Sequence, residues 1–502
     1  MPSSEDDEDE GDPWKRPRRG VWWIPSEPER KVAGILRRDA SGGGELTLED
    51  ALVVPEPRQG NVDPVPTIHG ASATGAEEFL LVDNYETRRE NIGSELLGPR
   101  TQAFSARYAL HHCVTEAVDP SVSSVWCKLD VLDAWCQPAT ALEERESLEP
   151  DGEGGYVTRL TLRWPPPISS LSPVGRISFE YPPDMPGGRW DRVTYRRRAY
   201  LKIDLEEDVP LSKLFESVLT PIRSLLHFAT GAELTFTQIN PSIRGNTAKI
   251  RATDLWCRCD PLDADGKRSP MSDDKAEDAC RHGFFTLRQI NEELPELWDR
   301  WFALHSAIRA PLYAVLGAMD YYSGRDLTDR FQSVAFAAEA LHRSLEYPAG
   351  RGLGKPEAKA LRRRIRDVLS PDEGKLTWLD GRITHLTDTP FTSRIEVLVD
   401  RSPACLQNAV GDDFAERVAR ARNEAAHLDD RTLETSPNEL HRLYNLLILV
   451  QAACIMSELG FPMSKVDGFI RYSDRFYELI RRGAIATHGR SEDETFEARP
   501  QD

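Results

Sequence analysis

An arginine and a histidine near the end of one helical segment form the most informative pattern in this 502-residue chain. In the string RNEAAH, Arg422 is followed by the amide Asn423, and His427 comes after four intervening residues. A histidine titrates near neutrality and can take the proton from a ribose 2′-hydroxyl. A guanidinium binds phosphate oxygens in a fork and neutralises the charge that develops there. The pattern predicts RNA cleavage by internal attack, with His427 as base, Arg422 on the phosphate, and Asn423 orienting the phosphate or the imidazole.

The spacing alone is not specific, because an arginine also precedes a histidine by five to seven positions elsewhere, at 107–112, 300–305 and 481–488. The first of these pairs lies on a predicted strand, the second includes the bulky Trp301, and the third begins a tail. Arg422 alone is followed by a small polar amide, at the end of an amphipathic segment that precedes a strongly apolar one.

Helix geometry leaves a structural alternative open. Five residues at about 100° each place Arg422 and His427 about 140° apart on an ideal helix. They converge only if the arginine reaches around or the helix unwinds near Ala426. Otherwise, Arg422 is a helix-terminal residue and His427 caps carbonyl groups.

The spacing of apolar residues is typical of strands in the first half of the chain and of helices in the second half, which predicts an α+β multidomain fold. Residues 1–19 read as a disordered acidic leader. Residues 20–283 alternate β-branched and aromatic residues between turn signals and predict a β-rich sensor or regulatory domain. Within it, residues 211–231 have helical spacing, which predicts one inserted helix. Residues 261–282 are polar and predict a loop or linker.

From residue 284 the apolar period becomes helical and predicts an all-α bundle over 284–482, followed by a flexible tail over 483–502. Ser436 is the expected N-cap of the last helix, with Glu439 three residues later, and Gly460 is expected to close that helix. The predicted helical blocks are 287–322, 329–347, 356–370, 413–428 and 436–461.

Composition narrows the possible functions. The net charge of −19, from 63 Lys and Arg against 82 Asp and Glu, argues against nucleic acid or anionic lipid over the whole surface, although a local basic groove remains possible. Eight cysteines are too few for a disulfide scaffold and suggest a reducing compartment. Cys257 with Cys259, and Cys280 with His282, lack the spacing of a zinc site, so we expect no metal and no cofactor.

The start of the chain has neither the positive nor the apolar region of a secretion signal. The most apolar stretch, residues 443–456, is about 14 residues long, which suits a buried core helix and not a membrane span. We therefore expect a soluble, cytoplasmic protein without a membrane partner.

A second basic feature fits RNA. Five cations in KPEAKALRRRIRDVL fall on one helical face, while Leu361, Ile365 and Val368 gather on another. This face predicts a contact with a phosphate backbone, and its alternative is a solvated surface. The cations are Lys355, Lys359, Arg362, Arg363 and Arg366.

Two other features are expected to have structural roles and not to take part in catalysis or RNA binding. Glu339 lies in an apolar helical segment, where a surface or capping carboxylate is favoured over a supporting role at the site. The Trp22–Trp23 pair is expected to lie in the core and not to stack on bases.

The string RNEAAH before a long apolar helix resembles the HEPN superfamily, whose ribonucleases carry arginine, a polar residue, and then histidine after four to six residues. The opening RGVWWIPSEPERKVAGILRRD (19–39), the β-rich region and FQSVAFAAEALHRSLE (331–346) are similar to ApeA-type proteins of bacterial anti-phage defence. Those proteins join a β-rich N-terminal domain to an ApeA-like HEPN domain. The resemblance implies a ribonuclease, with Arg422 and His427 in its site, that cleaves host RNA, tRNA above all, in abortive infection.

The resemblance also implies partners. One imidazole does not easily serve as both base and acid, and HEPN enzymes pair two domains across one cleft, so we expect a homodimer through the HEPN domain. A phage protein sensed by the N-terminal domain is the expected trigger. The alternative function is a non-catalytic HEPN module that binds RNA or protein, with the β domain as the interaction surface.

Overall fold

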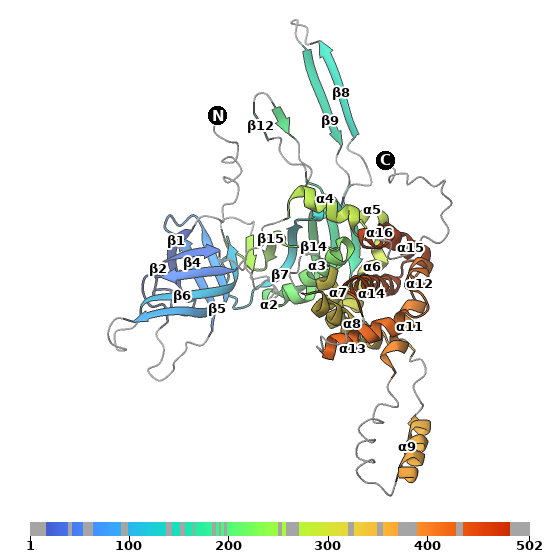
Figure 1. Ribbon diagram of the computed structural model, residues 1–502. Coiled ribbons are helices and arrows are strands. Elements are labelled where there is room, and N and C mark those ends of the chain that lie inside the picture. The colour runs from blue at the N-terminus through green and yellow to red at the C-terminus, as the bar shows by residue number, and fades with distance from the viewer. Residues whose placement is uncertain are drawn as a thin grey trace. The chain divides into compact units, whose positions relative to one another are not determined.

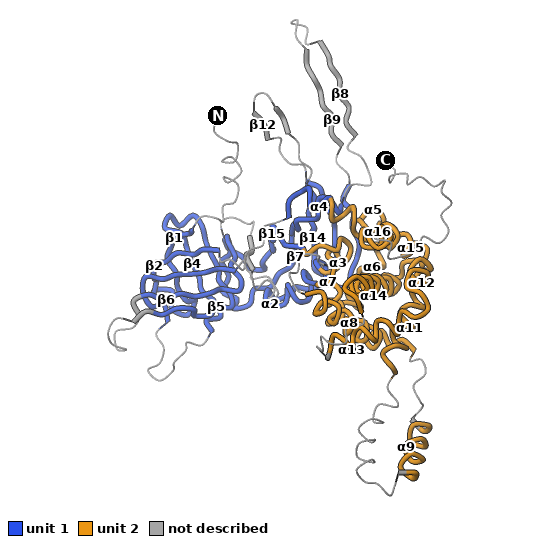
Figure 2. The backbone as a smooth tube through the Cα atoms, viewed as in Figure 1, with its two compact units in different colours: residues 1–223, 234–277 blue, residues 224–233, 278–502 orange. Residues whose placement is uncertain are grey.

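The chain forms two compact units, shown in Figure 2, in a computed structural model. Unit 1 comprises residues 1–223 and 234–277, and unit 2 comprises residues 224–233 and 278–502. The structure describes residues 17–38, 43–53, 64–91, 99–136, 143–150, 156–163, 166–182, 187–189, 192–194, 198–248, 254–257, 271–319, 326–348, 355–369, 389–427 and 435–481. Most of the predicted acidic leader and the whole predicted tail from 483 lie outside these residues.

Six strands of unit 1 close into an antiparallel barrel in the order β6-β3-β2-β1-β4-β5, with β5 paired back to β6 (Figure 1). A short strand, β16, extends the sheet beside β6. The strands are β1 (Arg18–Trp23), β2 (Val32–Arg38), β3 (Gly44–Leu48), β4 (Val65–Ser72), β5 (Glu78–Asn91), β6 (Pro99–His111) and β16 (Asp254–Cys257).

Trp22 fills the barrel core, where it is fully buried. Its ring lies against two glycines of neighbouring strands, because a Cβ added to Gly70 would come within 2.2 Å of the ring and one added to Gly34 within 3.1 Å. Glycine is thus required where strand backbones approach the indole. The prediction of a core role is confirmed for Trp22, whereas Trp23 is only partly buried and its ring lies 4.9 Å from Lys31 Nζ.

The second sheet of unit 1 is five-stranded, in the order β10-β11-β14-β7-β15, and every pairing is antiparallel. Its strands are β10 (Ile168–Ser172), β11 (Gly175–Glu180), β14 (Tyr200–Pro210), β7 (Ser121–Leu129) and β15 (Phe236–Ile243), and the short helix α1 (Leu132–Trp135) follows β7. Two further hairpins pair β8 (Glu143–Pro150) with β9 (Tyr156–Arg163) and β12 (Gly187–Arg189) with β13 (Arg192–Thr194).

The predicted inserted helix is present but not uniform. It runs as α2 (Leu211–Leu214), a π-helical turn η1 (Phe215–Leu219) and α3 (Thr220–Thr230), and Gly231 follows with a φ of 68°. Its C-terminal part, residues 224–230, belongs to compact unit 2. The physical reason is aromatic packing, since the Phe228 ring lies 5.5 Å from Phe284 and 6.2 Å from Trp301.

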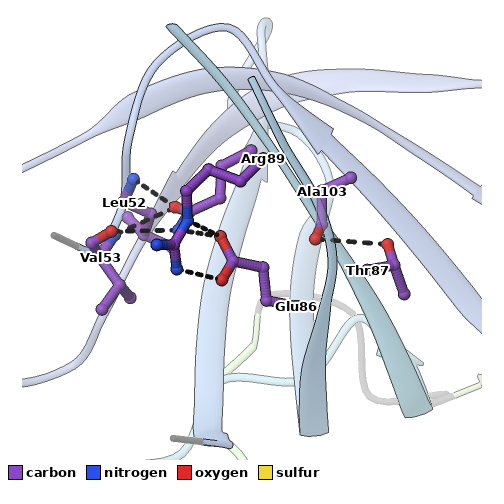
Figure 3. A network of polar contacts seen from close by, with 7 residues as sticks. Leu52, Val53, Glu86, Thr87, Arg89 and Ala103 are labelled. Atoms are coloured by element: carbon purple, nitrogen blue, oxygen red, sulfur yellow. Dashed lines mark hydrogen bonds and ion pairs between the residues drawn. The ribbon is translucent and has the colours of Figure 1, made fainter. Parts of the chain in front are cut away.

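A network of hydrogen bonds attaches the segment after β3, at Leu52 and Val53, to strands β5 and β6 of the barrel (Figure 3). The Arg89 Nε donates to Glu86 Oε1 at 2.8 Å, and Gln102 Nε2 donates to the same oxygen at 2.8 Å. The Gln102 amide also accepts from the backbone N–H groups of Leu52 and Val53 and donates to the Val53 carbonyl. This buried amide therefore satisfies backbone groups that no strand pairs.

Unit 2 is helical, and with the β-rich unit 1 it confirms the predicted fold class. Its helices are α4 (Asp273–His282, which starts in unit 1), α5 (Leu287–Ile290), α6 (Leu294–Ala307), α7 (Arg309–Met319), α8 (Leu327–Ser344), α9 (Lys355–Leu369), α11 (Phe391–Asp400), α12 (Ala404–Val410), α13 (Phe414–His427), α14 (Pro437–Glu458), α15 (Met463–Tyr472) and α16 (Asp474–Arg481).

Two predictions about this helical part were wrong. The segment 261–282 was expected to be a loop, but α4 occupies its last ten residues, with Ala276 and Cys280 buried one turn apart. The stretch 287–322 was expected to be a single helical block, but its described residues divide into α5, α6 and α7, and α6 and α7 meet at 101°. Pro311 explains the break between them, because it has no N–H to continue the hydrogen bonds of α6.

The helix α14 forms the centre of unit 2 and contacts α7, α8, α11, α12, α13, α15 and α16. Every residue from Leu443 to Met456 is buried. Ser436 caps its start by accepting from the Glu439 N–H at 3.2 Å, and Gly460, with a φ of 85°, follows its end, as predicted. The helix is long and apolar enough to cross a membrane, but 78% of that stretch is buried inside the protein, as in the core helix of a soluble protein.

Candidate active site

The helix α13 carries the predicted catalytic residues. Its apolar residues Phe414, Val418, Ala421 and Ala425 recur every three or four positions and are buried, which fixes one face toward the core. Arg422 is next to this face and only partly exposed, while Asn423 is exposed.

The helix continues without interruption to His427, its last residue. The unwinding near Ala426 that could have brought Arg422 and His427 together is therefore not present, because the residues on either side keep helical hydrogen bonding. The side chain of His427 lies outside the described residues. Its approach to Arg422 stays a prediction.

Arg422 lies against α8 and α11. Its Nη2 donates to Glu339 Oε2 at 3.4 Å, and its guanidinium carbon lies 5.0 Å from the Phe336 ring and 4.6 Å from the Phe391 ring. The side chain keeps 26% of its surface exposed. Its described contacts thus hold the guanidinium in place without enclosing it.

Glu339 is the centre of an arginine cluster, which we define as Glu339, Arg343, Arg394 and Arg422. Its carboxylate accepts from Arg343 Nη2 at 2.6 Å, lies 4.0 Å from Arg394 Nε, and accepts from Arg422 as described above. The expectation that Glu339 is a surface or capping carboxylate was wrong, because helix α8 turns it toward α11 and α13. Three guanidinium groups thus share one carboxylate among these four side chains.

His342 lies behind this cluster and is 2% exposed. Arg394 Nη1 lies 3.3 Å from His342 Nδ1, and since a guanidinium only donates, this ring nitrogen accepts. Burial lowers the pKa of His342, and the positive charges of Arg394, Arg343 and Arg401 lower it further. His342 is therefore a packing residue whose lowered pKa comes first from burial and then from the neighbouring guanidinium groups.

Sequence analysis missed Arg343, Arg394, Phe336 and Phe391. Arg394 was missed because no helix was expected at α11, where β-branched residues are common. A signal for Phe336 and Arg343 was present, since they lie three residues before and four after Glu339, on one stripe of α8.

The predicted basic face is on α9, and the helix itself is confirmed. Lys359, Arg363 and Arg366 are exposed and Arg362 is half-buried, while the side chain of Lys355 lies outside the described residues. None of them is among the described contacts of Arg422, so the structure does not join this face to the arginine cluster. The expected apolar seam is incomplete, because Val368 is 78% exposed.

Within the part of the chain that the structure describes, no group of three or more His, Cys, Asp or Glu residues could hold a metal ion. Of the pairs considered for zinc, Cys259 and the side chain of Cys257 lie outside that part. His282 instead pairs with Asp278 at 3.1 Å and Asp474 at 3.4 Å.

Comparison with known families identifies the class of protein to which this site belongs. Residues 333–465, which include most of α8 and all of α11, α13 and α14, match the family described as Apea-like HEPN. The helical unit therefore contains an HEPN domain, a class that generally consists of ribonucleases, and the arginine cluster with His427 lies within the match.

The rest of the chain identifies the family. Residues 17–301 match the family described as ApeA N-terminal domain 1, which covers more than half of the 502 residues, and the chain belongs to this family. The resemblance to ApeA-type proteins is thereby confirmed, and the two matches fit a nuclease-type role in anti-phage defence. No curated protein and no solved structure matches the chain.

Proposed function

We propose that the HEPN domain is a metal-independent endoribonuclease that cleaves host RNA, with tRNA as the main substrate, in abortive infection. The observation that supports it best is the arginine cluster. Arg422, five residues before His427 on α13, is held at the edge of a group in which three guanidinium groups share one carboxylate. Such a group binds an anion such as the RNA phosphate.

The cleavage begins at the ribose. The imidazole of His427 takes the proton of the 2′-hydroxyl, and the resulting oxygen attacks the adjacent phosphorus. Arg422 binds the phosphate oxygens and neutralises the charge that develops, while Asn423 orients the phosphate or the imidazole. The bond from phosphorus to the 5′-oxygen breaks, which leaves a 2′,3′-cyclic phosphate on one product and a 5′-hydroxyl on the other.

Glu339 acts as a positioning residue in this scheme. A guanidinium has five N–H groups, and the described polar contact of Arg422 with Glu339 uses one of them. The long 3.4 Å contact orients the group and leaves the other donors for phosphate oxygens. Arg343, which accounts for the shortest contact of Glu339, also reduces the negative charge that Glu339 would present to RNA.

The proposed active species is a homodimer formed through the HEPN domain, in which two Arg422 and His427 sets face one cleft. The argument is stoichiometric, because one imidazole accepts a proton while a second, protonated one assists the leaving 5′-oxygen. His342 is not a candidate for the second imidazole, since it is buried, and burial together with neighbouring arginines lowers its pKa. His441 is one turn into α14, where its ring lies 3.2 Å from the Asn445 amide.

The dimer is tested by mass in solution and by mixing. Inactive Arg422→Ala and His427→Ala proteins form mixed dimers with one intact arginine and one intact histidine across the cleft. These supply the base and the phosphate contact but lack the second imidazole, so mixing should recover only a small part of the cleavage. A protein that is monomeric at concentrations where it cleaves RNA fully would contradict the shared site.

The β-rich domain is proposed to sense a phage protein, in the cytoplasm. The support is architectural, since a separate compact unit with its own barrel precedes the HEPN domain. The enzyme is distinguished from a non-catalytic binding module by incubating the purified full chain with total tRNA and EDTA. Fragmentation supports the enzyme, and binding without fragmentation supports the binding module.

A further inference from the structure

Phe336 stands apart from the other large apolar residues of α8. It is 51% exposed, whereas Phe331, Val334 and Leu341 on the same helix are fully buried. The apolar side of α8 therefore faces the core without Phe336. This ring lies instead on the polar stripe with Glu339 and Arg343, three and seven positions further on.

The exposed ring adjoins the proposed phosphate site. The guanidinium carbon of Arg422 lies 5.0 Å from the Phe336 ring, and the partly buried Phe391 lies 4.6 Å from the same carbon. Phe391, on α11, is the more buried of the two rings and supports the arginine from the protein side. Phe336 contacts the same guanidinium and still leaves half of its surface in solvent.

An aromatic surface beside cations suits one ligand chemistry above others. Single-stranded nucleic acid presents phosphates and unstacked bases, and proteins bind it with cations for the former and aromatic rings for the latter. In a nucleotide, one sugar separates the phosphate from the base. A phosphate bound to Arg422 therefore places its base close enough to reach the exposed side of the Phe336 ring. The guanidinium groups of the arginine cluster complement that backbone.

The geometry points to Phe336 as a stacking platform for an unpaired base next to the scissile phosphate. This inference rests on the proposed function, because it takes the phosphate at Arg422 as its starting point. It also names the substrate class as single-stranded or looped RNA, since a base inside a duplex is already stacked on its neighbours and does not reach the ring.

The test uses the full chain with His427→Ala, so that RNA is bound and not cut. The probe is a short single-stranded RNA that carries one 2-aminopurine, whose fluorescence is quenched when it stacks, and the same strand in a duplex is compared. Phe336→Ala and Phe336→Leu should lose the quenching and weaken binding by about tenfold, whereas Phe336→Tyr should restore both. Tyr472→Ala removes another exposed aromatic of unit 2 and is the matched control, expected to bind normally.

Several results would overturn the inference. It is contradicted if the 2-aminopurine fluorescence is still quenched in Phe336→Leu, or if Tyr472→Ala loses as much quenching as Phe336→Ala. It is also contradicted if the duplex binds more tightly than the single strand, or if the single-stranded oligonucleotide does not bind. A Phe336→Ala protein that changes mass in solution while its RNA still stacks would make this ring a protein interface instead.

Cleavage by the chain with an intact His427 separates this inference from the proposed function. If that chain cuts no RNA but shows Phe336-dependent quenching, the nuclease proposal fails and the platform stands. If it cuts RNA and Phe336→Ala leaves the KM for single-stranded RNA unchanged, the platform fails and the nuclease stands.

Discussion

Both units contain a glutamate that is hydrogen-bonded to arginine, Glu86 in unit 1 and Glu339 in unit 2. The two glutamates differ in how many arginines contact them. In the barrel, the Glu86 carboxylate accepts hydrogen bonds from two nitrogens of Arg89 and from the Gln102 amide (Figure 3). Gln102 in turn hydrogen-bonds to the backbone of Leu52 and Val53. One cation meets one carboxylate, and the hydrogen bond to Glu86 is the chief cause that raises the pKa of Arg89. This network stabilises a segment of the chain.

In the helical unit, Glu339 is instead shared by three arginines, Arg343, Arg394 and Arg422. Two of these arginines, Arg394 and Arg343, also act on His342, whose pKa is lowered first by burial and then by their positive charges and that of Arg401. A one-to-one pair of arginine and glutamate stabilises the chain, whereas a group in which several arginines share one glutamate is what the proposed phosphate site requires.

The largest effect is expected at Arg422 and His427. Arg422→Ala or His427→Ala should each lower RNA cleavage by about 10³-fold and remove cellular toxicity, because one supplies the phosphate contact and the other the base. Arg420→Ala, an exposed arginine on the same helix, is the matched control and should stay active. Normal cleavage by a correctly folded His427→Ala protein would favour the non-catalytic HEPN module.

The comparison itself is tested by the same change at both glutamates. Glu339→Gln should lower kcat by about 10- to 100-fold at nearly unchanged KM, because the neutral amide lacks the negative charge that holds Arg422 in position. Glu86→Gln should leave kcat unchanged and lower the free energy of unfolding by about 1–3 kcal/mol, because it leaves the cation of Arg89 without its partner. Measuring kcat, KM and thermal unfolding on both variants checks this, and a purely structural Glu339 would lose stability with no loss of kcat.

A smaller effect is expected on α9. Lys359→Glu combined with Arg363→Glu should weaken RNA binding and flatten the plot of log K against log salt by roughly one to two units, with kcat at saturating RNA intact. Arg364→Glu, on the other side of this helix, is the control. An unchanged slope in the double variant would mean that the face is only solvated.

The smallest effect concerns His342. Because its pKa lies below 6.5, the unfolded chain takes up a proton that the folded chain does not, so the free energy of unfolding should fall as the pH decreases below 6.5. Arg343→Gln should raise the pKa of His342 by removing a nearby positive charge. An NMR titration of the imidazole in both proteins measures this, and an unchanged pKa would contradict the positive potential assigned to the arginine cluster.

Much of the fold could be predicted from the sequence because local patterns determine it. The strand alternation before residue 260, the apolar helix α14 and its Ser436 cap were all predicted correctly. The helix α11 was not, since its Ile and Val residues favour strands by propensity and only packing of Ile395 and Leu398 makes it helical. The barrel closure between β5 and β6 is likewise a tertiary pairing that no local pattern reveals.

The site was predictable only in part, for a similar reason. Arg422 and Asn423 lie on α13 as expected, but the partners of Arg422 come from two other helices, far away in the sequence. Glu339 seemed unremarkable on α8 because its three arginines are 4, 55 and 83 positions away. Only the packing of α8, α11 and α13 against one another brings these charges together.

The most direct test of the proposed ribonuclease is the chemistry of its product ends. The purified full chain is incubated with total tRNA in excess EDTA, and the fragments are analysed for their terminal groups. A site built on His427 and Arg422 predicts undiminished cleavage that leaves a 2′,3′-cyclic phosphate and a 5′-hydroxyl. Fragments with a 3′-hydroxyl, or loss of cleavage in EDTA that added Mg²⁺ restores, would contradict it.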